Sequence, residues 1–173
     1  MKLPTRGKRI QLRRLSPKDL PDFQAYRQDP EVGRYQGWSP ESDDTVAKFL
    51  VEMESVQLFQ TGKWCQIGIA ELENGQLIGD IGICLGGAGS ETELGFSLRK
   101  SSQGQGLATE ALNLCMDSLL QYHRVTRFRA ITDSRNSPAI QLLERLGMTR
   151  TEAVETTFKG EPCVDLVYQL HKV

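Results

Sequence analysis

Histidine and cysteine are scarce in this sequence, which argues against the common metal sites. Of the 173 residues, two are histidines and four are cysteines. No two cysteines form a C-x-x-C pair, so zinc sites of standard spacing are not indicated and we expect no bound metal. Most of the cysteines lie within apolar patterns, where a reduced thiol behaves as a small hydrophobic side chain. We therefore expect free thiols rather than disulfides at Cys65, Cys84, Cys115 and Cys163.

Long apolar runs and an excess of one charge are also missing. Without an apolar run of roughly 18 residues or an apolar segment near its start, the sequence predicts neither a membrane span nor a secretory signal. We therefore expect a cytoplasmic protein with no membrane partner. Lysine and arginine number 21 against 22 aspartates and glutamates, a net charge of −1. Because nucleic-acid binding normally needs a clustered basic excess, we expect no nucleic-acid partner.

Two well-known phosphate-binding motifs are absent as well. No G-x-x-x-x-G-K-[ST] occurs, and a dinucleotide-binding fingerprint would need a third glycine where Thr109 stands. The chain does have Gly104 and Gly106 directly before an expected helix. Glycines allow a sharp turn, and the first amides of a helix lack intrahelical partners, so this turn suits a phosphate or pyrophosphate. The alternative is an ordinary loop with a glycine N-cap.

Hydrophobic periodicity predicts one mixed α/β domain over residues 1–173. Strand-like patterns fall at 8–14, 64–73, 76–85, 91–98, 125–132, 148–158 and 163–171. Helical spacing and capping residues fall at 16–29, 39–60, from the glycine turn to about 123, and at 136–146. Asn74-Gly75 is a strong hairpin signal, and the order of elements predicts a central, mostly antiparallel sheet flanked by helices.

Three other segments carry specific expectations. Residues 6–14 hold the densest group of basic side chains and look like an edge strand with solvated charges. The connector 31–40 contains Tyr35 and Trp38, which either line a substrate cleft or pin the connector to the core. Residues 86–90 predict a flexible turn, and because no helix follows it, its glycines do not indicate a phosphate site.

Three segments together resemble the GNAT family of acetyl-CoA-dependent N-acetyltransferases. Within that family the chain is similar to the RimJ/RimL-type ribosomal-protein N-terminal acetyltransferases and the aminoglycoside 6′-N-acetyltransferases. The segments are Glu93–Leu98 (ELGFSL), Gln103–Ala111 (QGQGLATEA) and Asp133–Met148, which contains Asn136 and ends in LLERLGM. Their order and spacing fit, as does the predicted element order over essentially the whole chain. The resemblance implies the GNAT acyl-CoA N-acyltransferase fold and acetyl-CoA as co-substrate.

The resemblance also implies where coenzyme A binds. In the family, backbone N–H groups of the glycine turn bind the pyrophosphate, and the strand before it binds the pantetheine arm through main-chain hydrogen bonds. Asn136 holds a position used to bond this arm, and it also suits the N-cap of the helix that it begins. The cofactor-binding residues expected on these grounds are Phe96, Ser97, Leu98, Gln103, Gly104, Gln105, Gly106, Leu107, Ala108, Thr109 and Asn136.

Acetyl transfer to an amine needs a base, because an alkylammonium with a pKa of about 10.4 is protonated at neutral pH. The resemblance implies Glu93 as this base. The alternative is that Glu93 is a solvated strand carboxylate, and Glu91 is then the nearest substitute. The developing oxyanion would be met by strand amides near Phe96 and Ser97.

Two departures from the family pattern leave the general acid unassigned. Many members place a tyrosine where this chain has Leu143, and many of this branch have a serine where it has Ala139. A thiolate is a good leaving group, so activity does not require either residue. We expect direct acetyl transfer to a primary amine; the alternative is a catalytically weak acyl-CoA-binding or sensing module.

The acceptor amine stays open at this stage. A protein N-terminus, an aminoglycoside and a polyamine-like amine are all compatible with the chain. An acidic cleft that favours a cationic acceptor is hinted at by Glu31, Glu41, Asp43 and Asp44. Homodimers are frequent among GNAT proteins, although the sequence gives no direct sign of one.

Overall fold

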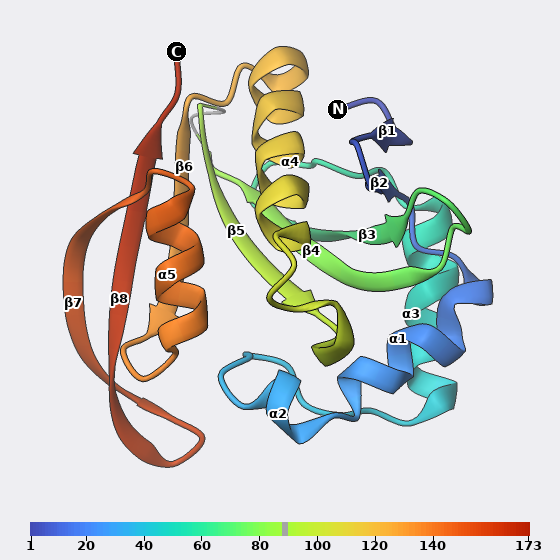
Figure 1. Cartoon of the computed structure of the whole chain (residues 1–173), viewed down its shortest axis with the longest axis horizontal. Helices are drawn as coiled ribbons and strands as arrows, with labels where there is room; N and C mark the ends of the chain where they lie inside the picture. The colour runs from blue at the N-terminus through green and yellow to red at the C-terminus, as the bar shows by residue number, and fades with distance from the viewer. Residues whose placement is uncertain (88–89) are drawn as a thin grey trace.

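The fold is built on an eight-stranded sheet in the order β1-β2-β3-β4-β5-β6-β8-β7, with helices on both faces (Figure 1). The computed structural model describes residues 1–87 and 90–173. The strands are β1 (Thr5–Arg6), β2 (Ile10–Arg13), β3 (Trp64–Glu71), β4 (Leu77–Leu85), β5 (Glu91–Leu98), β6 (Arg127–Asp133), β7 (Thr149–Phe158) and β8 (Glu161–His171). The helices are α1 (Leu20–Arg27), α2 (Pro30–Gly33), α3 (Asp43–Ser55), α4 (Leu107–His123) and α5 (Ser137–Arg145), with short 3-10 helices η1 (Pro17–Asp19) and η2 (Lys100–Ser102).

Two apolar clusters hold the helices against the sheet. The larger cluster packs α4 and α5 on one face, with Leu112, Leu143 and Phe128 among its buried members. The smaller cluster packs α1 and α3 on the other face, through Phe23 and Leu50. Burying a side chain of this size contributes about 1.5–3 kcal/mol, so these clusters fix the helices in place.

The sheet opens in its middle, between β5 and β6. These two strands run parallel and pair only where Glu91–Glu93 meets Arg127–Arg129. Further along, β5 stays paired with β4 as far as Leu98, while β6 stays paired with β8. The edge of β5 from Leu94 to Leu98 is therefore left without a strand partner. Figure 1 shows β5 curving away from β6 at this point.

The mostly antiparallel sheet expected from the sequence is confirmed, but the predicted limits of the second helix are wrong. The N-cap of α3 is Ser42, whose side chain accepts a hydrogen bond from the Thr45 N–H. Residues 39–41 are not helical, and the side-chain amides of Gln24 and Gln28 hold the Glu41 carbonyl at 3.0 and 2.9 Å. The helix also ends at Ser55 rather than near residue 60.

The basic segment 6–14 is not an edge strand with solvated charges, because β2 lies between β1 and β3. Arg13 donates to both carboxylate oxygens of Asp19 at 2.7 and 2.8 Å. Arg14 donates to carbonyls at the end of α3, including those of Met53 and Val56 at 3.0 and 2.9 Å. These arginines thus join β2 to the helices. The sequence also missed β1 and the one-turn helix α2 within the connector.

Two further expectations concern the membrane and the turn at 86–90. Within the described part of the chain, no helix is both long and apolar enough to cross a membrane. The predicted turn includes residues 88 and 89, which lie outside the described residues.

Candidate functional site

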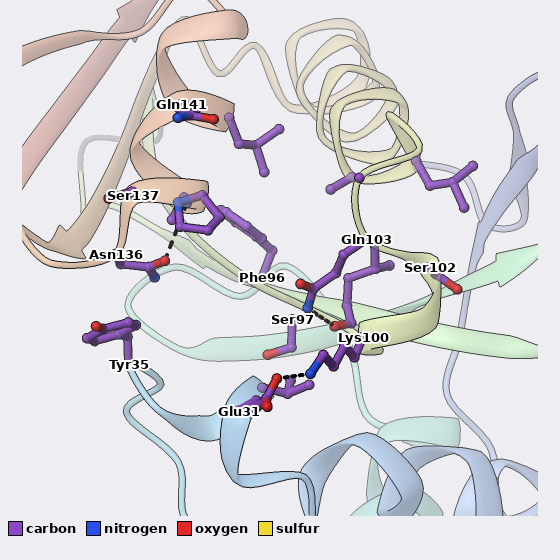
Figure 2. A pocket seen from close by; sticks show the side chains of 18 of the residues that line it. Glu31, Tyr35, Phe96, Ser97, Lys100, Ser102, Gln103, Asn136, Ser137 and Gln141 are labelled. Atoms are coloured by element: carbon purple, nitrogen blue, oxygen red, sulfur yellow. Dashed lines mark hydrogen bonds and ion pairs between the residues drawn. The ribbon is translucent and has the colours of Figure 1, made fainter.

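A large cavity lies beside the open edge of β5, between the first turns of α4 and α5 and the connector that carries α2. Its volume is about 700 Å³, within the range of about 300–1,000 Å³ that is typical of ligand sites. Figure 2 shows side chains from these elements converging on it. It is lined by Glu31, Val32, Arg34, Tyr35 and Gln36 of the connector, by Phe96, Ser97 and Leu98 of β5, and by segments of 100–109 and 135–145.

The cavity brings together most of the residues that the sequence indicates. All of the expected coenzyme-binding residues line it except Gln105, and Tyr35 lines it as well. Trp38 and Glu93 lie outside the lining. Sequence reasoning missed Gln36, which belongs to no motif and contacts β5 across 60 positions of the chain.

The turn before α4 depends on two glycines. Gly104 and Gly106 have φ angles of 73° and 77°, in the left-handed region that side chains rarely adopt. A Cβ atom at Gly104 would meet nothing within 4 Å, so the backbone there is open. Gly106 is the N-cap of α4 and provides no side-chain hydrogen bond to the first turn. The first amides of a 17-residue helix are thus left for an anion, where the helix dipole also favours negative charge.

An ion pair that the sequence did not reveal holds this turn. The Glu110 carboxylate, on the first turn of α4, accepts from the backbone N–H groups of Lys8 and Arg9 at 2.7 and 2.8 Å and from Arg9 Nε at 3.0 Å. Arg9 Nη1 donates to the Gln105 carbonyl at 2.9 Å. Partial burial alone would raise the pKa of Glu110, but the hydrogen bonds from Arg9 and Lys8 outweigh burial and lower it. The turn is therefore tied to the chain just before β2.

The open edge of β5 presents the backbone groups of alternate residues. Arg99 N–H donates to the Ile78 carbonyl of β4 at 2.8 Å. In an antiparallel pair, the groups that face the partner strand recur at every second residue. The backbone of Ser97 therefore faces β4, whereas the N–H and C=O groups of Phe96 and Leu98 face away from β4, toward the gap.

Glutamine side chains hold both of these carbonyls. Gln36 Nε2 donates to the Phe96 carbonyl at 3.0 Å, and Gln103 Nε2 donates to the Leu98 carbonyl at 2.9 Å. Figure 2 shows the Gln103 bond at the cavity wall. These two carbonyls on the unpaired edge of β5 are therefore held by side-chain amides, one from the connector and one from the glycine turn.

The two aromatic residues of the connector do different things. Tyr35 lines the cavity, and the Arg135 guanidinium lies 5.8 Å from its ring centroid. Trp38 Nε1 donates to Ser97 Oγ at 3.1 Å, and the Arg27 guanidinium lies 4.3 Å from the Trp38 ring centroid. Tyr35 is thus a cavity residue, and Trp38 pins the connector to the sheet.

A buried ion pair supports Trp38. Asp80 of β4 and Arg27 of α1 are 2% and 7% exposed, with an N–O distance of 2.9 Å. The Tyr26 hydroxyl donates to the same carboxylate at 2.5 Å. Burial, and next the charge of Asp80, raise the pKa of Tyr26 well above its usual value, so the phenol stays a neutral donor. The cluster joins α1 to β4 beside the Trp38 ring of the connector.

The start of α5 borders the cavity opposite the connector. Asn136 is its N-cap, and the side-chain oxygen accepts from the Ala139 N–H at 3.4 Å, as the sequence indicates (Figure 2). Arg135 pairs with Asp133 at 2.7 Å. Hydrogen bonds from the Arg135 side chain hold the pKa of Asp133 below its usual value. Arg135 is thereby fixed at the cavity, beside Tyr35.

Glu93 lies on β5 outside the cavity lining. Its carboxylate accepts from Arg129 Nη1 at 2.7 Å, and both side chains are partly exposed. Alternate residues of a strand share a face, so Gly95 and Ser97 lie on the same side as Glu93. A Cβ atom at Gly95 would meet nothing within 4 Å. The space over Gly95, between Glu93 and Ser97 on this face of the strand, is therefore open.

Basic side chains outnumber acidic ones in the cavity lining. Among the described residues, the lining holds four basic side chains and one acidic side chain: Arg34, Lys100, Arg135 and Arg145 against Glu31. Glu31 is itself paired with Lys100 (Figure 2). The acidic residues at the start of α3 lie outside the lining: Glu41, Asp43 and Asp44. The acidic cleft suggested by the sequence is therefore not found here, and the cavity suits an anionic ligand.

Metal-ligating side chains and thiols are dispersed over the described residues. Among the described residues, no group of three or more histidine, cysteine, aspartate or glutamate side chains could hold a metal ion. All four cysteines have free thiols. Burial raises the pKa of the Cys65 and Cys115 thiols, which makes them less reactive.

Comparisons with known proteins agree with this geometry. The family model for the acetyltransferase (GNAT) domain matches residues 9–149. A curated relative, the uncharacterized N-acetyltransferase p20 of Bacillus licheniformis, is 27% identical over 143 residues, which cover 82% of this chain and 80% of that protein. A GNAT-family acetyltransferase from Bacillus anthracis has the same fold, with a TM-score of 0.85, 17% identity and 98% coverage of both chains. RimL, a ribosomal L7/L12 alpha-N-protein acetyltransferase solved with coenzyme A, superposes with a TM-score of 0.84, 15% identity and 98% coverage of both chains.

Proposed function

Because this chain belongs to the GNAT acetyltransferase family, we propose that its cavity binds acetyl-CoA and that the acetyl group passes directly to a primary amine. One observation carries the assignment of the cavity. A glycine turn with free helix amides stands beside a strand edge that has no strand partner. The first feature suits the diphosphate of coenzyme A, and the second suits a chain of amides.

Each part of the coenzyme has cavity residues that we propose would hold it. The amides of the turn Gln103–Thr109 would receive the pyrophosphate. The pantetheine arm contains two amide groups, which can pair with the Phe96 carbonyl and with the N–H and C=O groups of Leu98 and so continue the sheet into the gap. The Asn136 side chain would add a hydrogen bond to the arm while it caps α5. Excess positive charge in the lining favours the phosphates.

We propose Glu93 as the base. The amine nitrogen attacks the thioester carbonyl, a nitrogen–carbon bond forms, and the carbon–sulfur bond breaks to release the thiolate. The amine proton reaches Glu93 through water in the open space over Gly95. General base catalysis of this kind would contribute about 10²–10⁴-fold in rate. Phe96 N–H faces the gap and is the donor proposed for the oxyanion, whereas the backbone of Ser97 faces β4. No side chain is assigned as the acid.

The proposed acceptor is a protein N-terminus, ahead of aminoglycosides and polyamines. An α-amine has a pKa of about 7.7–8.0 against about 10.4 for an alkylamine, so about one molecule in ten is already deprotonated at pH 7. Such an acceptor needs less help from a base, which suits a Glu93 carboxylate that also accepts a hydrogen bond from Arg129. The basic lining disfavours a polycation. RimL, whose fold is similar, acts on a protein α-amine. We place this activity in the cytoplasm, where protein N-termini and acetyl-CoA meet.

Thiol release from acetyl-CoA tests this proposal. The panel holds peptides that begin with Ala or Ser, the same peptides with a blocked N-terminus, an aminoglycoside and spermidine. We expect release with the free peptides and none with the blocked ones. Release with spermidine or the aminoglycoside alone would overturn the acceptor. Acetyl-CoA binding by calorimetry without release from any amine would instead favour an acyl-CoA-binding or sensing module.

A further inference from the structure

The Phe96 carbonyl, on the edge of β5, is held from the connector side of the cavity. Gln36 Nε2 donates to it at 3.0 Å. Both residues line the cavity, so the glutamine amide stands in the space where a ligand would reach this carbonyl. A primary amide N–H is also the same kind of donor as an amide N–H of a pantetheine arm. Gln36 therefore makes the bond that the coenzyme would make.

The segment that carries Gln36 is anchored at both ends, and between them the Gln36 N–H donates to the Gly33 carbonyl at 3.1 Å, which closes a turn within the segment. On one side, Lys159 Nζ donates to the Gly33 carbonyl at 3.0 Å. On the other side, Trp38 Nε1 donates to Ser97 Oγ at 3.1 Å. Between Gly33 and Gly37, the Gln36 side chain gives the one hydrogen bond to the sheet found among the described residues. Arg34, Tyr35 and Gln36 thus form a short flap with a glycine at each end.

We propose that Gln36 is a displaceable gate residue, whose side-chain amide holds the Phe96 carbonyl until an amide of the coenzyme arm replaces it. The proposal rests on acetyl-CoA binding in this cavity, as proposed above. When Gln36 leaves the strand edge, the flap of residues 34–36 is released and carries Tyr35 with it. Coenzyme binding therefore changes the connector wall of the cavity, where Tyr35 would meet the acceptor.

The energetics set the size of the effect. A neutral hydrogen bond stabilises a folded protein by a small net amount, equivalent to about 2- to 10-fold in an equilibrium constant. Removing the amide from residue 36 leaves the Phe96 carbonyl without its donor only in the free protein. The coenzyme then has nothing to displace, so affinity rises. A residue that merely packs against the coenzyme would lower affinity when it is shortened or replaced.

Calorimetry of acetyl-CoA binding to Gln36→Leu is the first test. We expect about 2- to 10-fold tighter binding than in the wild type. Gln28→Leu is the matched control, since Gln28 Nε2 donates to the Glu41 carbonyl at 2.9 Å, a bond of the same kind just after the connector and outside the cavity. Its affinity stays at the wild-type value. Gln36→Met, which is also unable to donate, repeats the expectation if the leucine variant does not fold.

Trypsin cleavage after Arg34 is the second test, because this exposed residue lies in the flap. Ligands usually protect a protein from proteolysis, but here coenzyme A should speed cleavage at Arg34 in the wild type. Gln36→Leu should be cleaved quickly at Arg34 even without coenzyme A. Equal or weaker coenzyme affinity in Gln36→Leu, or protection of Arg34, would overturn the gate. A wild-type protein that binds no acetyl-CoA would overturn the proposed function instead.

Discussion

The Glu93 carboxylate is paired with Arg129, and as the base it would also accept the proton of the amine. Glu93→Gln keeps the shape of the side chain and removes the proton acceptor. We expect kcat to fall at least about tenfold. Acetyl-CoA affinity should stay within about twofold, since Glu93 lies outside the cavity lining. Initial rates and calorimetry measure the two quantities.

Glu91 offers the matched control for that substitution. It lies on the same strand and pairs with Arg127 at 3.4 Å, so Glu91→Gln breaks a comparable link between β5 and β6. We expect nearly normal turnover. An equal loss in both variants would attribute the effect to strand pairing, and full activity in Glu93→Gln would exclude Glu93 as the base.

Gly106 tests the pyrophosphate cradle. Its φ of 77° is strained for any branched side chain, and it is the N-cap of α4. Gly106→Val should shift the first amides of α4 and weaken acetyl-CoA binding at least about tenfold. Gly147→Val, at a φ of 80° after α5, carries similar strain away from the cradle and should bind normally. Normal affinity in Gly106→Val, measured by calorimetry, would contradict the cradle.

At the scale of the residue, the sequence predicts the features that depend on residues nearby in the chain. Gly104, Gly106 and the N-cap Asn136 are readable because turn and cap chemistry depends on the next few residues. Gln36 and Arg9 are not readable, since their partners at Phe96 and Gln105 lie 60 and 96 positions away. A long-range contact leaves no periodic mark in the chain.

At the scale of the element, periodicity predicts a strand but not its neighbour. Asn74-Gly75 predicts that β3 pairs with β4, because a tight turn forces the pairing. Nothing comparable predicts that β5 and β6 separate after Glu93, although this gap forms the candidate site. The start of α3 was misplaced for a related reason, since Gln24 and Gln28 hold the residues before it from another helix.

The attachment of α4 to the segment before β2 gives a prediction with a defined pH dependence. Glu110→Gln removes the charge that holds Arg9 and should destabilise the fold at neutral pH. The folded state lowers the pKa of Glu110, so its contribution is present above the usual value of about 4.3 and is lost as pH falls through the lower folded pKa. Urea unfolding should show a constant difference between wild type and variant from pH 7 to about 5, shrinking below about pH 4. A difference independent of pH down to about 3 would contradict this role.

At the scale of the whole molecule, the buried pair of Arg27 and Asp80 connects the sheet to the connector that borders the cavity. Arg27 bonds to Asp80 of the sheet and lies against the ring of Trp38, which pins the connector. The order and type of the helices and strands predict the fold, because each of them has its own hydrophobic periodicity. The periodicity does not reveal the pair of Arg27 and Asp80, since a charged residue in an amphipathic pattern normally lies in solvent. Its partner becomes known only once α1 packs on β4.

Removing one partner of this pair should affect stability and the acceptor together. Asp80→Ala leaves the Arg27 guanidinium buried without its counter-charge, and we expect a loss of about 3–5 kcal/mol in the free energy of unfolding. Asp80→Asn keeps an acceptor for Tyr26 and should lose less. Asp22→Ala is the control away from the site. Among the described residues, its carboxylate accepts one side-chain hydrogen bond, from the exposed Gln76 amide at 3.0 Å, and the change should stay within about 0.5 kcal/mol. In Asp80→Asn the KM for the peptide acceptor should rise more than the Kd for acetyl-CoA, because Arg27 supports Trp38 and the connector rather than the glycine turn. Urea unfolding and steady-state kinetics measure these changes. An equal rise in the KM for the peptide and the Kd for acetyl-CoA would show that the buried pair does not act on acceptor binding in particular.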